Sequence, residues 1–563
     1  MGIAVKISTW KRQVFTWLNM INLGLALLSA LLLTAVFPPV ELSFFAFVAL
    51  IPWLVVVSRT GTKTQLVISY LAGLAFFFLN DLWIVPITIP GYISMSIYLG
   101  LYWPATGFLV QRLLRRWSLP LFLAAPAVWV SFEYIRSWMI TGFPWFFLGH
   151  SQARNLSLIQ IADLTGVYGI SFMLAMINGA IVELILSSKN RQFRRAIPAL
   201  VSAGVALLAT FFYGQFRLHQ TTTRPGPVLA VVQEDFPMFV DTDAPDCDEI
   251  LQAFMAVSVQ AAQTHPDMLI WPETCVGVPV NPEFLNATVE NKGDKSEQRY
   301  ARGVADYLGK HAKRSNSYLL LGALSRQINP PGHSPAEDKF NSAVIFDRQG
   351  NYMDRYDKIR LVLFGEVVPF RYTIPKLYWF LNEHMTPYGK GGYEYSLTAG
   401  REPKRFTLVT PAENLRYSVA ICYEDTMSDL IAGFVSPVQG KKQIDFLVNI
   451  SNDGWFNHSC ELIQHFYMCV FRAVENRIAV ARSVNTGISG FVNPDGSIEA
   501  MMTDGSRIYG PGIRGFLTRQ IKIDSRSTVY SIIGEWPVLV LTVLVMAFGV
   551  VLPFFVKPDK IGK

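Results

Sequence analysis

The sequence predicts a protein in two parts, a polytopic α-helical membrane domain and an α/β domain. Only 16% of the residues are charged and 51% are apolar, whereas ordinary soluble proteins have roughly 25% charged residues. Long uncharged stretches fill the first 215 positions and return only near 536 to 556, with a normally charged segment between them. We therefore expect a membrane domain over 1–215, a globular domain over 216–531, and a last transmembrane helix with its tail over 532–563.

The net charge of +7 is carried largely by basic residues that lie beside apolar stretches, not along a groove-like run with stacking aromatics. A membrane surface is therefore the expected partner, and nucleic acid is not. The five cysteines are widely spaced and include no CxxC pair, so neither a disulfide framework nor a zinc ribbon is indicated.

A helix needs about 20 apolar residues to cross a hydrocarbon core of roughly 30 Å. Eight stretches are candidates, namely 20–37, 42–58, 64–84, 92–111, 119–136, 166–187, 196–214 and 536–556. The first follows basic residues as a signal peptide would, but it ends in Phe37-Pro38-Pro39 without a small-residue cleavage site. We therefore expect an uncleaved anchor.

Lysine and arginine alternate between the loops, and cytoplasmic loops retain basic residues during insertion. One set of loops holds Lys6, Lys11, Arg12, Arg59, Lys63, Arg112, Arg115, Arg116, Lys189, Arg191, Arg194, Arg195, Lys557, Lys560 and Lys563. The other set holds little beyond Arg154, with Arg136 at the edge of a stretch. The pattern predicts a cytoplasmic N-terminus, a globular domain outside the cytoplasmic membrane and a cytoplasmic tail.

Eight spans are also typical of a transporter or channel. Apart from edge residues such as Asp81 and Glu133, however, the stretches hold few ionisable groups, and ion pathways usually contain intramembrane charges. The sequence also has no internal repeat of the kind that many transporters show. Both observations disfavour transport.

Between Arg217 and Ser531, short apolar runs alternate with amphipathic stretches, which is typical of an α/β domain. The expected strands are 228–232, 268–271, 318–321, 343–346, 417–421, 446–450 and 478–482. Helical spacing of apolar residues predicts helices over 247–263 and 299–313, and polar or Pro-rich composition predicts surface loops over 286–297 and 329–338.

Three strand ends each supply a reactive side chain. Glu273 follows the apolar run MLIW, Cys422 follows YSVAI, and Lys358 precedes Glu366 in the segment KIRLVLFGE. Each signal alone is weak, because a lone cysteine after a strand is usually a small core residue. Glu273 and Lys358 could likewise form a solvated ion pair.

Together, a glutamate, a lysine and a cysteine in this chain order resemble the nitrilase, or carbon-nitrogen hydrolase, superfamily. The local motifs resemble apolipoprotein N-acyltransferases over nearly the whole chain: WPE, FGE, CYE, SNDGWF, NTGISGFVNPDG and TVYSIIGEWP. Two departures are LVLFGE, where that family more often has LVPFGE, and an apparent insertion over 329–338. Neither departure involves the three reactive residues.

The resemblance implies a nitrilase-type α-β-β-α sandwich as the catalytic domain, on the periplasmic side of the inner membrane. It implies transfer of an acyl group from a phospholipid to the α-amino group of a diacylglyceryl-cysteine apolipoprotein, with no cofactor and no metal. Cys422 would be the nucleophile, Glu273 the base and Lys358 the oxyanion stabiliser. Supporting roles would fall to Glu366, Tyr423 and Glu424.

Several other features have alternative interpretations. The aromatic stretch 372–380 could form a lid or a lipid-facing lip, or it could be ordinary packing. Cys275 is expected to pack, and His458, Cys460 and His465 match no closed zinc site. Two competing functions remain, a membrane-tethered amidase or nitrilase that hydrolyses the thioester, and a transporter with a degenerate extracytoplasmic domain.

Overall fold

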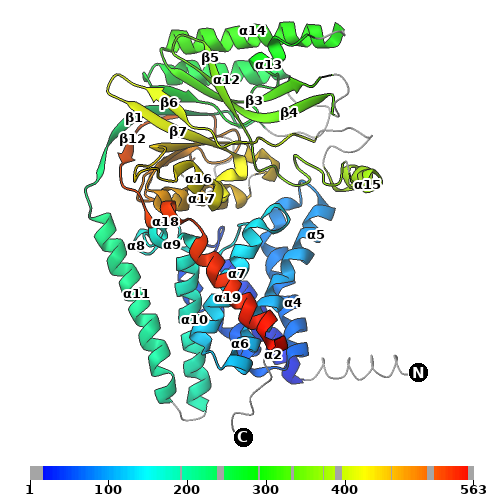
Figure 1. The fold of residues 1–563 in the computed structure, drawn as a ribbon, viewed down its shortest axis with the longest axis vertical. Coiled ribbons are helices and arrows are strands. Elements are labelled where there is room, and N and C mark those ends of the chain that lie inside the picture. The colour runs from blue at the N-terminus through cyan, green and yellow to red at the C-terminus, as the bar shows by residue number, and fades with distance from the viewer. Residues whose placement is uncertain are drawn as a thin grey trace. The chain divides into compact units, whose positions relative to one another are not determined.

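The structure is a computed structural model, and its chain divides into two compact units (Figure 1). The first comprises 1–85, 89–219 and 533–563, and the second comprises 86–88 and 220–532. The structure describes residues 17–189, 193–236, 246–288, 292–330, 335–371, 373–386, 396–457, 459–503 and 513–555.

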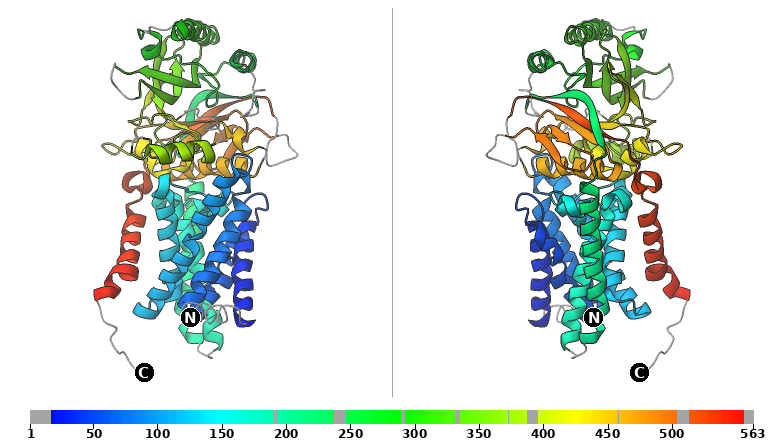
Figure 2. Two further views of the ribbon diagram at one scale, coloured as in Figure 1. Left: turned by 90° about the vertical axis from the view of Figure 1, so that its right-hand side faces the viewer. Right: turned by 90° about the vertical axis from the view of Figure 1, so that its left-hand side faces the viewer.

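The first unit is helical, and its long helices run side by side along one direction (Figure 2). Its helices are α2 (Trp17–Ala35), α3 (Ile51–Arg59), α4 (Thr62–Asn80), α5 (Ile89–Gly100), α6 (Tyr102–Trp117), α7 (Leu121–Trp138), α8 (Leu156–Ile159), α9 (Ala162–Thr165), α10 (Val167–Lys189), α11 (Ile197–Leu218), α19 (Trp536–Met546) and α20 (Leu552–Phe555). On α11, Val205 and Phe212 are 60% and 64% exposed. Such outward apolar side chains are those of a membrane helix facing lipid.

The expected count of eight spans is not confirmed. Among the described residues, five helices are long and apolar enough to cross a membrane, namely Thr62–Asn80, Ile89–Trp117, Val167–Ser188, Ile197–Leu218 and Trp536–Phe555. The expected stretch 42–58 is divided between a short 3-10 helix and the nine-residue α3, which has a proline in its first turn. The stretch 119–136 becomes α7, which buries the ionisable residues Glu133 and Arg136.

The second unit contains two six-stranded mixed sheets. Its strands are β1 (Thr223–Gln233), β2 (Met268–Ile270), β3 (Tyr318–Ile328), β4 (Glu337–Phe346), β5 (Tyr352–Asp357), β6 (Phe406–Val409), β7 (Asn414–Ile421), β8 (Phe446–Ser451), β9 (Ala479–Val484), β10 (Gly490–Val492), β11 (Ile498–Met501) and β12 (Gly515–Asp524). The first sheet has the order β12-β1-β2-β3-β4-β5 and the second has β11-β10-β9-β8-β7-β6. The centre of each sheet is a parallel triplet, β1-β2-β3 and β7-β8-β9.

Helices cover the outer face of each sheet, which gives the expected α-β-β-α sandwich (Figure 1). Helices α12 (Cys247–Ala262), α13 (Pro282–Leu285) and α14 (Lys292–Ser315) cover the first sheet, and α16 (Ser428–Val435) and α17 (Glu461–Asn476) cover the second. The inner faces meet where β1 contacts β9. There the hydroxyl of Ser483 shares its hydrogen between the carbonyl oxygens of Val232 and Ile270, each 2.9 Å away.

All seven expected strands and both expected helices are present, but both expected loops are partly wrong. Residues 292–297 belong to α14, which begins with a polar segment ahead of its apolar positions. Residues 289–291 lie outside the described residues. In the other expected loop, 329–338, residues 337 and 338 belong to β4, and residues 331–334 lie outside the described residues.

Candidate active site

Cys422 is the first residue after β7 and begins a short 3-10 turn, Cys422–Thr426. Its backbone is left-handed, with φ at +55°, a conformation that is uncommon and strained for a residue with a Cβ. Burial and the negative charge of Glu273 raise the pKa of its thiol to about 12, against the opposing charges of Lys358 and His465. The thiol is therefore protonated at neutral pH and needs a base to become a nucleophile.

Glu273 follows β2 on the opposite sheet, and its side chain is buried. Gly322 of β3 permits this position, because a Cβ there would lie 2.5 Å from both the Glu273 Cα and the Pro272 carbonyl oxygen. Burial raises the pKa of Glu273, and the positive charge of Lys358 opposes that rise. A carboxylate with a raised pKa is a better proton acceptor, which suits a general base.

Lys358 follows β5 and is only 1% exposed. Its Nζ lies 3.2 Å from Glu273 Oε1 and 2.9 Å from Glu366 Oε1. Burial alone would lower the pKa of Lys358, but the acidic groups of Cys422, Glu273 and Glu366 outweigh burial and hold it well above its ordinary value. The ammonium group is therefore a fixed cation beside the thiol.

Asn341, which the sequence analysis missed, joins the two carboxylates. Its Nδ2 donates to Glu273 Oε1 at 2.7 Å and to Glu366 Oε1 at 2.9 Å. Its backbone carbonyl oxygen accepts from the backbone N–H of Lys358 at 2.8 Å. Asn341 lies in β4, where every residue from Phe340 to Phe346 is buried. A polar side chain inside a buried strand was the available signal.

Glu424 fixes the turn that carries Cys422. Its Oε2 accepts from the N–H of Ile421 at 2.8 Å, and its Oε1 accepts from the N–H groups of Ile359 and Arg360 at 2.8 and 3.0 Å. The hydroxyl of Tyr356 donates to both oxygens. Glu424 thus connects the turn after β7 to the backbone that follows Lys358. Burial raises the pKa of Glu424 to about 7, although these hydrogen bonds oppose the rise.

Glu366 and Tyr423 are the remaining expected site residues, and Cys275 was expected to pack. Glu366 accepts from Lys358 and also from the N–H of Val362 at 2.9 Å, so it closes the loop after Lys358. Tyr423 is half-buried beside Cys422, and burial raises the pKa of its phenol. Cys275 is buried and donates to the Gly322 carbonyl oxygen at 3.3 Å.

The aromatic stretch 372–380 forms part of α15 (Pro375–Met385), and Tyr372 lies outside the described residues. In this helix Tyr378 is buried, whereas Trp379 and Phe380 are 45% and 56% exposed. His458 and the glycine-rich segment 389–392 also lie outside the described residues.

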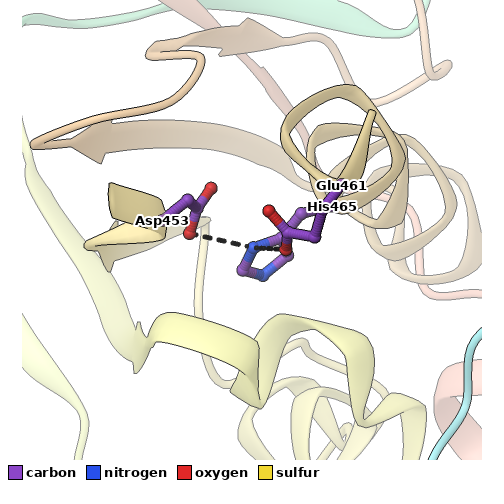
Figure 3. Close-up of side chains that lie close together, drawn as sticks. All are labelled: Asp453, Glu461 and His465. Carbon is purple, nitrogen blue, oxygen red and sulfur yellow. Dashed lines mark hydrogen bonds and ion pairs between the residues drawn. The ribbon is translucent and has the colours of Figure 1, made fainter. Parts of the chain in front are cut away.

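His465 contacts Asp425 of the turn Cys422–Thr426, and Asp453 and Glu461 lie close to its ring (Figure 3). The three side chains are buried, and one ligand-type atom from each lies within 4.8 Å of the others. The Nδ1 of His465 is 3.1 Å from Asp453 Oδ1 and 3.4 Å from Glu461 Oε1. His465 thus belongs to a buried polar network close to Cys422 rather than to a site with Cys460.

The fold and the convergence of a glutamate, a lysine and a cysteine define a carbon-nitrogen hydrolase, and residues 229–510 match that family's sequence model. Residues 29–180 match the model of the apolipoprotein N-acyltransferase N-terminal domain. An apolipoprotein N-acyltransferase from Geobacter metallireducens is 30% identical over 85% of this chain and 86% of its own length. The chain therefore belongs to the apolipoprotein N-acyltransferase family and is an acyltransferase of the membrane.

Other relatives extend the comparison. Apolipoprotein N-acyltransferase 1 from Treponema denticola is 26% identical over 92% of this chain and 93% of its own length. Among solved structures, an amidase from Nesterenkonia sp. matches 55% of this chain and 94% of its own, at 16% identity and a TM-score of 0.34. Membership in the acyltransferase family leaves no support for the transporter interpretation.

Proposed function

We propose that this enzyme transfers an acyl chain from a membrane phospholipid to the N-terminal α-amino group of a diacylglyceryl-cysteine lipoprotein, through a thioester on Cys422. The observation that carries the proposal is the buried Lys358 cation, which lies between Glu273 and Glu366 and acts electrostatically on the Cys422 thiol. The lipoprotein acceptor follows from the names of the relatives, and the phospholipid donor follows from the sequence resemblance.

In the first half-reaction, Glu273 removes the thiol proton as sulfur attacks the ester carbonyl carbon of the donor. The oxygen of the tetrahedral intermediate then carries a negative charge, which the Lys358 ammonium stabilises. When the intermediate collapses, the carbon–oxygen bond of the ester breaks, and the lysophospholipid oxygen takes the proton from Glu273. The products are a lysophospholipid and a Cys422 thioester.

In the second half-reaction, the neutral amine of the lipoprotein attacks the thioester carbonyl. Glu273 accepts a proton from the attacking nitrogen, the carbon–sulfur bond breaks, and the proton passes to the departing sulfur. The enzyme returns to its starting protonation state. A hydrolase would differ only here, because water would replace the amine.

The test is to give the purified enzyme phospholipid alone and then add a diacylglyceryl-cysteine peptide. We expect a mass gain of one acyl chain, a single stoichiometric burst of lysophospholipid, loss of the label to hydroxylamine, and discharge to the peptide as an amide. Cys422→Ala should show none of these, whereas the buried Cys275→Ala should behave like the wild type. Continuous release of fatty acid without peptide would identify a hydrolase instead.

We also propose that the catalytic domain lies on the periplasmic side, because lysine and arginine alternate between the loops. Cysteines introduced at the exposed residues Lys295 and Arg194 probe the two sides. In a Cys247→Ala background, which removes an exposed native thiol, an impermeant reagent should label position 295 in intact cells and not position 194. The reverse labelling would invert the topology.

A further inference from the structure

Four buried charged residues form a closed ring that includes Asp425 of the turn Cys422–Thr426, the nucleophile turn. Asp425 Oδ2 lies 3.0 Å from Arg482 Nη1, Arg482 Nη2 lies 2.7 Å from Asp453 Oδ2, Asp453 Oδ1 lies 3.1 Å from His465 Nδ1, and His465 Nε2 lies 2.9 Å from Asp425 Oδ1. All four side chains are 0% or 1% exposed. They come from the nucleophile turn, the segment after β8, α17 and β9.

The ring reaches Cys422 through Asn449 of β8. Arg482 Nη1 donates to Asn449 Oδ1, and Asn449 Nδ2 donates to the carbonyl oxygens of Ala420 and Cys422 at 3.2 and 3.0 Å. One of these carbonyls belongs to Cys422 itself, whose backbone is left-handed, and the other lies two residues before it. Asp425, a ring member, is the fourth residue of the same short turn.

We propose that Asn449 and the ring of Asp425, Arg482, Asp453 and His465 position the Cys422 nucleophile, by holding its strained backbone in the left-handed conformation. Asn449 is a positioning residue that acts on the carbonyl of Cys422, and Arg482 fixes the direction of the Asn449 amide. His465 completes the ring by linking the two aspartates that hold Arg482. The proposal rests on the assignment of Cys422 as the nucleophile under the proposed function.

The hydrogen-bond geometry requires an imidazolium ring. Both nitrogens of His465 face carboxylate oxygens, so each nitrogen must carry a hydrogen. The charged groups that face His465 are Asp425, Asp453, Glu461 and Arg482; despite burial and Arg482, the two aspartates hold the pKa of His465 well above its usual value. Two carboxylates and two cations make the ring neutral.

A divalent cation held by Asp453, Glu461 and His465 is the competing interpretation (Figure 3). That cation would have to displace the hydrogen between His465 Nδ1 and Asp453. It would also lie beside the Arg482 guanidinium, which already contacts Asp453. The proton-linked ring satisfies the same atoms without such repulsion.

The test measures the alkylation rate of Cys422 in the full-length enzyme at neutral pH, with the modified residue located by peptide mass spectrometry. Asn449→Ala removes the hydrogen bonds to the Ala420 and Cys422 carbonyls without changing charge, so it should lower the single-turnover acylation rate about 10-fold or more, with a smaller effect on the alkylation rate. His465→Gln leaves the ring with one net negative charge, which opposes formation of the thiolate, so the alkylation rate should fall by about 10-fold, the equivalent of one pKa unit. Adding Asp453→Asn to His465→Gln restores neutrality and should return the alkylation rate.

The matched control is His311→Gln, because His311 is also buried and bonds Ser258 at 2.8 Å, far along the chain from the ring. Its acylation and alkylation rates should equal those of the wild type. Wild-type acylation in Asn449→Ala, or a wild-type alkylation rate in a folded His465→Gln, would show that the ring is only structural and would overturn the proposal. A stoichiometric divalent metal in the purified enzyme, whose removal abolishes acylation, would overturn it too. Failure of the thioester in every form, wild type included, would instead refute the proposed function.

Discussion

Replacing Lys358 with methionine, alone and together with Glu366→Gln, separates the contribution of Lys358 to stability from its contribution to catalysis. Methionine keeps a flexible side chain of similar length, so the main change is loss of the ammonium group. Glu273 and Glu366 would then face each other with Asn341 Nδ2 as the donor common to both, at 2.7 and 2.9 Å. Because Lys358 is 1% exposed, solvent cannot replace it.

The magnitudes follow from burial and distance. Removing one partner of a buried ion pair costs about 3–5 kcal/mol. Lys358 lowers the pKa of Glu273 and Glu366 raises it, so the pKa of Glu273 should rise further in the variant. A carboxyl with a raised folded-state pKa favours folding at low pH and loses that contribution as the pH rises. The stability penalty should therefore be smaller near pH 5 than near pH 8.

Adding Glu366→Gln removes the surplus charge, so the double variant should recover most of the lost stability. It should not recover acylation, because no cation faces the tetrahedral intermediate, and loss of such a donor costs about 10²–10³ in rate. Thermal unfolding and the lysophospholipid burst measure the two effects on the same sample. A double variant that acylates at the wild-type rate would show that Lys358 only balances charge.

Lys442→Met is the matched control. Lys442 is also buried, and its Nζ donates to the carbonyl oxygens of Arg477 and Asp524 rather than to a catalytic group. The variant should lose stability yet acylate normally per folded molecule. A burst as weak as that of Lys358→Met would mean that destabilisation alone explains both.

Two further predictions concern close packing and pH. Gly322→Ala places a Cβ 2.5 Å from the Glu273 Cα, so we expect a loss of about 1–3 kcal/mol and a weaker burst; unchanged unfolding and burst would show that the strand is not tightly packed there. Burial and Asp453 raise the pKa of Glu461 from 4.5 to about 7, so its contribution to stability is lost as the pH rises between these values. Glu461→Gln stays neutral, and from pH 5 to 8 its stability relative to the wild type should rise by on the order of 1–3 kcal/mol; parallel unfolding curves against pH would contradict the shift.

The sequence predicted most of the strands because their apolar runs are short and bounded by turns. It also indicated Glu273 and Cys422 directly, since each stands next to the end of a buried parallel strand. Asn341 escaped because its partners lie 68 and 25 residues away, and no local pattern encodes such pairing.

Helix α17 escaped for another reason. All of its residues from Glu461 to Asn476 are buried, including charged ones, whereas helical periodicity assumes that charged residues face solvent. The count of eight spans was not confirmed, because hydropathy reports composition and not backbone hydrogen bonding. The stretch 42–58 is apolar throughout its interior, yet its helix does not continue between Phe47 and Ile51.

The strand order of the first sheet has a consequence for biosynthesis. Strand β1 opens the domain, but its antiparallel neighbour β12 ends it, with Thr223 paired to Asp524. Until β12 has been synthesised, the edge of β1 that pairs with it stays open. Pairing between strands so distant in the sequence also forms slowly. Because β1 also neighbours β2, the strand that leads to Glu273, a nascent chain lacks the finished scaffold for its base, so we expect no acyl transfer before translation has passed residue 524.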